Sequence, residues 1–243
     1  MTNLSLVIPC YNEADNLPYL LERISGHPSM AKVEVILVDN GSSDATPTVL
    51  RQLLILYPQI RSIRVEKNQG YGYGILRGLD VAKGNILGWT HADMQTDLLD
   101  VCRALEKFIP GQNLDMIVKG KRIGRSPVDY IFTLGMQIFS SLILGVNLDD
   151  INAQPKLFTR NFYEKYIRNQ APFDFSIDLF LLYSARIFGV KIINVPVIFS
   201  NRLHGDAKGG GGTFKTRIKI ISRTIIYIFQ IRGSKCQKSN VNY

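Results

Sequence analysis

Polar side chains gather in the segment WTHADMQTD, residues 89–97, directly after the apolar run NILG. Asp93 and Gln95 stand two residues apart there, so strand periodicity would turn a carboxylate and an amide oxygen to the same side. Hard oxygen ligands of this kind suit Mg²⁺, which proteins commonly bind through one or two carboxylates together with substrate phosphates. Because the pair offers only one formal charge, we expect weak metal binding unless a diphosphate adds its own oxygens.

Three further polar segments each follow an apolar run: CYNEAD, DNGSSD and NQGYGYG. Carboxylates at such positions can accept hydrogen bonds from ribose hydroxyls or a base N–H, and Tyr11 offers a face for stacking. Because Asp39 ends an apolar run, we expect it to contact a ligand. Two roles stay open for Asp44, one in a binding pocket and one as the N-cap of a helix that begins in ATPTVL.

The elements that must position these segments follow from the hydrophobic pattern. Strand-like runs cover residues 4–9, 33–39, 62–67, 85–89 and 115–120, and helix-length amphipathic segments cover 16–26, 45–57, 73–84 and 97–108. This alternation predicts an α/β fold, a mostly parallel central sheet with helices on both faces. Such sheets bind ligands outside the carboxyl ends of their strands, where all four polar segments would lie.

Composition narrows the classes of function. The 243 residues are 46% hydrophobic and 20% charged, which excludes a disordered chain and a coiled coil. A net charge of +9 indicates an anionic partner. We expect no nucleic acid, because neither basic-aromatic interleaving nor a recognised binding motif is present. The three cysteines are an odd number without metal-ligand spacing, which favours reduced thiols in a cytosolic setting.

A dinucleotide-binding fold is excluded by the position of the glycines. GYGYG at residues 70–74 looks like a phosphate loop, but the dinucleotide fingerprint places its glycines between the first strand and its helix. The segment at that place is CYNEADN, which has no glycine. A nicotinamide-dependent oxidoreductase is therefore not expected.

The segments VIPCYNEADNL, VILVDNGSSDAT, NQGYGYGILRG and HADMQTD resemble, in this order and spacing, the family 2 glycosyltransferases with the GT-A nucleotide-diphosphosugar fold. The resemblance covers at least residues 4–100. It implies a UDP- or GDP-linked sugar as donor and Mg²⁺ or Mn²⁺ against the donor pyrophosphate. It also implies a set of donor-binding positions: Pro9, Tyr11, Glu13, Asp39, Asp44, Gly70, His91 and Ala92.

In one respect the sequence departs from the family. The segment after the fourth strand usually carries two aspartates one residue apart, and His91 occupies the first of these positions. The resemblance leaves Asp93, with Gln95, as the metal ligands, and we give Asp93 a catalytic role as well. For His91 we favour a hydrogen-bonded pocket residue over a metal ligand.

The second half narrows the resemblance to the polyprenyl-phosphate sugar transferases, the dolichyl-phosphate mannose synthase-like branch, through HADMQTD, DINAQPKLF and FSIDLFLLYSARIFGVKIINVPV. The implied acceptor is a lipid monophosphate, whose second pKa of about 6 makes it an anion that needs cations more than a base. Candidate cations are Arg122, Arg202, His204 and Lys208. Bidentate phosphate recognition favours the two arginines, which we count as catalytic.

Two alternatives remain. The apolar helix expected at 130–148 has no arginine or lysine, although this branch often places one there. Asp178 could be a general base for a sugar hydroxyl, or it could orient loops or cap a helix. Inverting transfer to a saccharide hydroxyl in cell-envelope polysaccharide synthesis is thus one alternative, and a catalytically inactive nucleotide-sugar-binding protein is the other.

We expect residues 1–213 to form the GT-A domain and residues 214–243 a basic amphipathic helix and tail. That helix could lie in the headgroup layer of an anionic membrane surface or pack on the sheet. Residues 130–148 contain polar side chains, which favours a buried or interfacial helix over a membrane span. Because the first residues show no signal-peptide pattern, we expect a cytoplasmic protein, peripheral on the inner face of the cell membrane.

Overall fold

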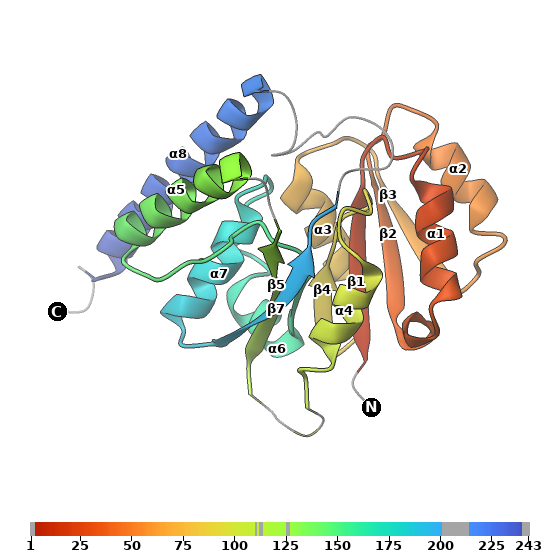
Figure 1. Ribbon diagram of the computed structural model, residues 1–243, viewed down its shortest axis with the longest axis horizontal. Coiled ribbons are helices and arrows are strands. Elements are labelled where there is room, and N and C mark those ends of the chain that lie inside the picture. Colours follow the sequence, from red (N-terminus) through yellow and green to blue (C-terminus); the bar gives the residue numbers. More distant parts are fainter. Residues whose placement is uncertain (1–2, 110, 112–113, 125–126, 201–213, 240–243) are drawn as a thin grey trace.

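The computed structural model describes residues 3–109, 111, 114–124, 127–200 and 214–239. In this part of the chain, strands form one sheet in the order β3-β2-β1-β4-β6-β5-β7 (Figure 1). The strands are β1 Leu4–Cys10, β2 Glu34–Asn40, β3 Ile60–Val65, β4 Ile86–Trp89, β5 Met116–Ile123, β6 Lys156–Thr159 and β7 Lys191–Ile198. Neighbouring strands pair in parallel except at β6, which is antiparallel to both β4 and β5.

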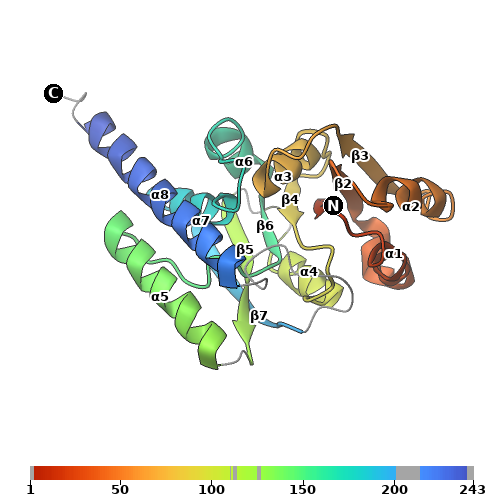
Figure 2. The ribbon, with the colours of Figure 1, turned by 90° about the horizontal axis from the view of Figure 1, so that it is seen from above.

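Helices cover both faces of the sheet, as the alternating pattern predicted (Figure 2). They are α1 Leu17–Gly26, η1 Pro28–Lys32, α2 Thr46–Leu53, α3 Tyr71–Asp80, α4 Leu98–Leu105, α5 Pro127–Leu144, α6 Arg160–Tyr166, α7 Ile177–Ile187 and α8 Phe214–Ser239. One hydrophobic core lies between the sheet and α1, α2 and α4, and a second lies between the sheet and α3, α6 and α7. Because both faces are covered, strands such as VILVD are apolar almost throughout.

The expected strands and helices of the first 120 residues are all present, with ends shifted by a few residues. Strand β6 and helix α6 were not predicted, because β6 has only four residues and begins with a lysine. That lysine, Lys156, is fully buried in the structure. The short strand fills the centre of the sheet between β4 and β5.

Helices α5 and α8 lie side by side at one end of the molecule (Figures 1 and 2). Phe139 of α5 meets Phe229 of α8 edge-on at 6.3 Å between ring centroids, and Tyr227 packs against Phe180 of α7. Ile228 joins the core beneath. Helix α8 therefore packs mainly on α5 and α7. It does not pack mainly on the sheet, which was the alternative considered from the sequence.

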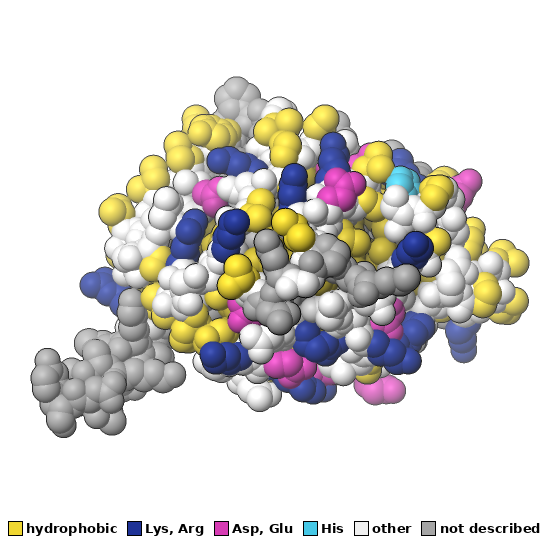
Figure 3. Space-filling view, turned by 90° about the horizontal axis from the view of Figure 1, so that it is seen from below, with side chains coloured by type: hydrophobic (Ala, Val, Ile, Leu, Met, Phe, Trp, Pro, Cys, Tyr) yellow, Lys and Arg dark blue, Asp and Glu magenta, His cyan; other side chains and the backbone are white. Residues whose placement is uncertain are grey.

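Much of the apolar surface of these two helices stays exposed. The exposed large apolar side chains on them are Tyr130, Ile131, Phe132, Ile138, Leu142, Ile218, Ile226 and Phe229. None of the helices within the described ranges is both long enough and apolar enough to span a bilayer. Lys and Arg side chains are spread among apolar ones on the face drawn in Figure 3, so the positive charge is distributed over that surface.

Candidate functional site

The loops that follow β1, β2, β3 and β4 meet at one edge of the sheet, at the carboxyl ends of parallel strands. The chain runs outward from β1 through β2 to β3 and then returns to place β4 on the other side of β1. A crevice at such a reversal is where open α/β sheets bind ligands. The four polar segments of the sequence are therefore brought to one place.

The first two loops are tied to each other by hydrogen bonds. The Asn12 backbone N–H donates to Ser42 Oγ at 3.0 Å, and the Ser43 N–H donates to Asn12 Oδ1 at 2.8 Å. The Glu13 N–H donates to Thr46 Oγ1 at 2.8 Å. Asn12 itself has a positive φ of 55°. These contacts fix the shape of the wall between β1 and β2 before any ligand arrives.

Two buried carboxylates lie behind this wall. Glu13 is 8% exposed and accepts from Asn16 Nδ2 at 2.6 Å, while Asp39 is 2% exposed and accepts from the Ser42 N–H at 3.0 Å. Burial raises the pKa of the Cys10 thiol, and the charges of Glu13 and Asp39 raise it further. The negative charges of Glu13 and Asp39, which add to this shift, suit a ligand that presents O–H or N–H groups.

The remaining residues expected around a donor lie nearby in the same loops. Pro9 is partly exposed at the end of β1, and Tyr11 is 37% exposed. Asp44 Oδ1 accepts from the Thr46 N–H at 2.9 Å, and its Oδ2 accepts from the Ala14 N–H at 3.4 Å. Asp44 therefore supports the first turn of α2 and links the two loops, while its contact with a ligand stays a prediction.

The third loop is held against residues 171–175. Gly70 has a φ of 121°, and a Cβ placed there would lie 2.2 Å from the Phe173 carbonyl oxygen, so only glycine fits. The Tyr73 N–H donates to that same carbonyl at 2.9 Å, and Asn40 Nδ2 donates to the Gly70 carbonyl at 2.9 Å. The start of α3 is thus locked between β2 and this loop.

An aromatic stack joins the third loop to the fourth. The Tyr71 ring stacks on Phe175 at 4.7 Å and on His91 at 5.7 Å between centroids. Burial holds the pKa of Tyr71 well above its usual range, with smaller contributions from the charges of Asp178 and Asp93. The Tyr71 hydroxyl is buried and has no hydrogen-bond partner among the residues that the structure describes. Sequence reasoning missed Tyr71, whose only signal was an aromatic residue between the glycines of GYGYG.

The segment with Asp93 and Gln95 is not a strand. The prediction that strand periodicity would turn these two side chains to the same side was therefore wrong in its reason. Strand β4 ends at Trp89, and Met94 has a φ of 56°. The loop nevertheless alternates in exposure, with His91, Asp93 and Gln95 partly exposed and Ala92 and Met94 buried. The expected side chains therefore reach the same surface by a different backbone path.

The side-chain oxygen atoms of Asp93 and Gln95 are the atoms of this segment that could bind a metal ion. Asp93 Oδ1 accepts from the Gln95 N–H at 3.2 Å, and Gln95 Nε2 donates to the Ser200 carbonyl at 3.2 Å. No cluster of three or more His, Cys, Asp or Glu side chains suited to a metal occurs among the described residues. One carboxylate and one amide oxygen fit a hard cation that arrives with phosphate oxygens, and not one held by protein alone.

Asp178 lies in the first turn of α7 and is 3% exposed, and its charge contributes to the raised pKa of Tyr71. Its Oδ1 lies 2.5 Å from Lys156 Nζ and accepts from Gln154 Nε2 at 3.1 Å and Trp89 Nε1 at 3.3 Å. Burial lowers the pKa of Lys156, against the attraction of Asp178. These three donors fix the orientation of the Asp178 carboxylate. Sequence reasoning did not find these partners.

Arg122, at the end of β5, is paired with Asp150. Its Nε donates to Asp150 Oδ1 at 2.9 Å, its backbone N–H donates to Oδ2 at 2.6 Å, and the guanidinium lies over the Phe199 ring at 5.5 Å. A phosphate bound there would share the guanidinium with a carboxylate. The other expected cations, Arg202, His204 and Lys208, lie outside the described residues.

Comparison with known proteins identifies a matching family and relatives that are similar in sequence. A family model for glycosyl transferase family 2 matches residues 5–176. The chain is 27% identical over 239 residues to a dolichyl-phosphate beta-glucosyltransferase of Trichomonas vaginalis, covering 92% of this chain and 73% of that protein. It is 26% identical over 212 residues to an undecaprenyl-phosphate 4-deoxy-4-formamido-L-arabinose transferase of Aeromonas hydrophila, covering 85% of this chain. The chain spans only 63% of that second relative's length.

Solved structures share the fold at low identity. A mannosyltransferase of Pyrobaculum calidifontis, solved with GDP-Man and Mn²⁺, matches with a TM-score of 0.60 and 21% identity over 83% of this chain and 57% of that one. Glucosyl-3-phosphoglycerate synthase of Mycobacterium tuberculosis, solved with UDP, matches with a TM-score of 0.70 and 17% identity over 96% of this chain and 80% of that one. The expected GT-A fold is thereby confirmed.

Proposed function

Since the chain belongs to glycosyl transferase family 2, we propose that it transfers a sugar from a nucleotide-diphosphate sugar to a polyprenyl-phosphate lipid, inverting the anomeric centre. The names of the two sequence relatives support a lipid-phosphate acceptor. The observation that carries this choice is the ion pair between Asp178 and Lys156. Three donors surround Oδ1 of this carboxylate and hold it in an orienting role, and an ionised phosphate acceptor needs no base.

The crevice between the first two loops is our proposed donor site. Tyr11 would stack on the base, while Glu13 and Asp39 would accept from base or ribose groups. The donor would be UDP- or GDP-linked, by analogy with the ligands of the fold neighbours.

Asp93 and Gln95 would hold Mg²⁺ or Mn²⁺ together with the donor diphosphate, because their side-chain oxygen atoms are suitable ligands for a hard cation. When bound, such an ion neutralises charge on the diphosphate leaving group. Tyr71, whose raised pKa keeps its hydroxyl protonated, is placed to donate a hydrogen bond beside Asp93. Donors preorganised toward developing charge are commonly the largest contribution to catalysis.

In the reaction, an ionised oxygen of the acceptor phosphate forms a bond to the anomeric carbon from the face opposite the diphosphate. The bond from that carbon to the diphosphate oxygen breaks, and its electron pair leaves with the nucleoside diphosphate. No proton has to be removed, because the acceptor oxygen is already an anion near neutral pH. Direct displacement of this kind inverts the anomeric configuration.

We place the reaction at the cytoplasmic surface of the membrane. The exposed apolar side chains of α5 and α8 and the exposed cations Lys219 and Arg232 of α8 support this location. In this proposal residues 1–213 form the catalytic domain and residues 214–243 contribute to surface binding.

Calorimetric titration of UDP- and GDP-sugars, with and without Mn²⁺, tests the donor site. We expect wild type to bind one donor class only with metal, and Asp93→Ala to lose this binding at least tenfold while keeping its fold. The matched control is Asp97→Ala, which removes a nearby carboxylate whose Oδ1 accepts from the Leu99 N–H at the start of α4. The control should lose about 1 kcal/mol of stability and keep donor binding.

Transfer is then measured with a polyprenyl phosphate and with saccharide acceptors. Near-normal transfer by Asp93→Ala would remove the metal assignment. Donor binding without turnover on any acceptor would favour a nucleotide-sugar-binding protein without catalysis.

A further inference from the structure

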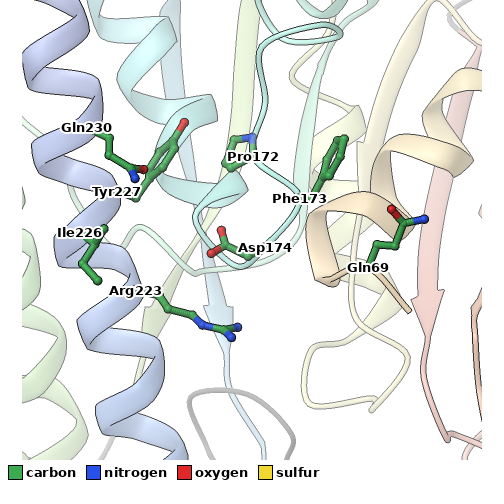
Figure 4. Close-up of a pocket in the computed structure, with 8 residues that line it drawn as sticks. All are labelled: Gln69, Pro172, Phe173, Asp174, Arg223, Ile226, Tyr227 and Gln230. Carbon is green, nitrogen blue, oxygen red and sulfur yellow. The ribbon is translucent and has the colours of Figure 1, made fainter. Parts of the chain in front are cut away.

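A pocket of about 410 Å³ lies between α8 and the loop at residues 171–175 (Figure 4). Its lining is Gln69, Pro172, Phe173, Asp174, Arg223, Ile226, Tyr227 and Gln230. Helix α8 supplies one wall, and the loop with the residue before Gly70 supplies the other. The pocket therefore lies between α8 and the segment that precedes α7.

The pocket has one cationic side chain and one anionic side chain. Arg223 and Asp174 both project into the space between helix and loop (Figure 4). Asp174 Oδ1 accepts from the Ser176 N–H at 2.9 Å, which leaves its charge in the pocket. Burial raises the pKa of Tyr227, and Asp174 raises it further, so the Tyr227 hydroxyl is a protonated donor.

Arg223 differs from the cations near the strand ends, which have carboxylate partners. Arg122 is paired with Asp150, and Lys156 with Asp178. Within the described ranges, Arg223 forms no ion pair. Its guanidinium is therefore available to an anion from outside the chain.

The pocket adjoins the proposed site through a single loop. Phe173 and Asp174 line the pocket, and the next residue, Phe175, stacks on Tyr71. Tyr71 in turn stacks on His91, beside Asp93. On its other side the pocket has Ile226, an apolar side chain that is 58% exposed on α8. One ligand could thus present an anion to Arg223 and an apolar chain to Ile226.

We propose that this pocket captures the phosphate of a lipid monophosphate, with Arg223 as the cation and Ile226 beside the first carbons of the chain. The inference rests on the proposed function, because it names where that acceptor is first bound. A guanidinium matches phosphate with two parallel N–H donors. Helix α8 then supplies the cation that the sequence of α5 lacks.

The sign of the two charges gives a specific test. Binding of geranyl phosphate, a short water-soluble probe, is measured by calorimetry on the full chain. Arg223→Gln should weaken binding at least tenfold, while Asp174→Asn should leave it unchanged or tighten it, because a carboxylate repels a dianion. The matched control is Arg232→Gln on the same helix, outside the pocket, which should stay within twofold of wild type.

Weaker binding in Asp174→Asn would overturn the proposal, since a saccharide that uses both charged groups behaves that way. Equal loss in Arg223→Gln and Arg232→Gln would also overturn it, because only general charge would then matter. Inorganic phosphate and geraniol separate the sources of the anion. Inorganic phosphate that binds as tightly as geranyl phosphate would refute a lipid site.

Turnover separates this proposal from the proposed function. In Arg223→Gln we expect the KM for the lipid phosphate to rise at least tenfold, with kcat and donor binding within twofold of wild type. If wild type binds geranyl phosphate through Arg223 but binds no sugar nucleotide, the proposed function fails and the pocket stands. If donor binding and transfer are normal in Arg223→Gln, the pocket fails and the proposed function stands.

Discussion

At the scale of single residues, two buried lysines set the electrostatics beneath the site. Lys119 and Lys156 have no exposed side-chain surface, and each lies near a carboxylate, Asp149 at 3.5 Å and Asp178 at 2.5 Å. Burying a charge costs free energy even when a partner is present. Such lysines are retained for a reason other than stability, and orienting Asp178 is the role that the geometry of Lys156 offers.

Lys119 makes this cost measurable as a pH dependence. Burial lowers its pKa from 10.5 to about 8, with Asp149 opposing the shift. Between these two values the unfolded chain binds more protons than the folded one, so the free energy of unfolding rises with pH through this window. The cost is fully present below pH 8 and is gone above pH 10.5, a difference of about 3 kcal/mol.

We therefore predict that wild type gains about 3 kcal/mol relative to Lys119→Met between pH 7 and pH 10.5. Urea unfolding of both proteins across this range measures the difference. Titrations of groups that do not interact with Lys119 cancel in the comparison, since the two chains differ at one position. A difference that is flat with pH would contradict this prediction, because it would mean that Lys119 has the same pKa in the folded and the unfolded chain.

Only some of the residues in the candidate site could be predicted from the sequence. Carboxylates at strand ends, such as Asp39 and Asp93, were found because their chemistry and position are visible locally. Lys156 and Tyr71 were missed, because a buried lysine reads as a surface residue and an aromatic residue between glycines reads as part of a turn. Their roles arise from contacts with Asp178 and Phe175, which are far away in sequence.

At the scale of elements, the contact between the start of α3 and the loop at residues 171–175 holds the aromatic stack together. We predict that Gly70→Ala lowers the free energy of unfolding by about 2 kcal/mol or more, because the added Cβ meets the Phe173 carbonyl at 2.2 Å and φ is 121°. The matched control is Gly26→Ala at the end of α1, where a Cβ meets nothing within 4 Å. This control should change stability by less than about 1 kcal/mol.

Urea unfolding monitored by circular dichroism measures both glycine variants. A loss in Gly26→Ala as large as that in Gly70→Ala would show that the loss of glycine itself, and not the close approach, sets the cost.

The helices and strands of the parallel part of the sheet could be predicted from hydrophobic periodicity in the sequence. Strand β6 escaped prediction since its position between β4 and β5 is set by pairing with distant strands.

At the scale of the whole molecule, the exposed apolar side chains of α5 form a stripe. Ile131, Ile138 and Leu142 are spaced by seven and four residues, which places them on one face of the helix, and they are 66%, 49% and 76% exposed. Helix α8 lies alongside with its basic residues. This surface could not be predicted from the sequence of either helix alone, because the surface depends on how the two helices pack together.

We predict that the protein binds vesicles of anionic phospholipid through this surface. Ile131→Ser combined with Leu142→Ser should weaken binding at least tenfold, since each apolar side chain that enters the headgroup layer contributes about 1.5–3 kcal/mol. The matched control is Ile55→Ser with Leu56→Ser, which removes equally exposed apolar side chains, 79% and 70%, near α2 at the far end of the molecule.

Vesicle sedimentation at low and high salt separates the two contributions to this binding. The basic residues of α8 should make wild type bind less at high salt, because attraction to anionic lipid falls off within a Debye length. The α5 variant should keep that salt dependence while losing affinity, since its charges are unchanged. Equal loss in both pairs of variants, or binding to neutral vesicles as strong as to anionic ones, would contradict a surface built from an apolar stripe and a basic helix.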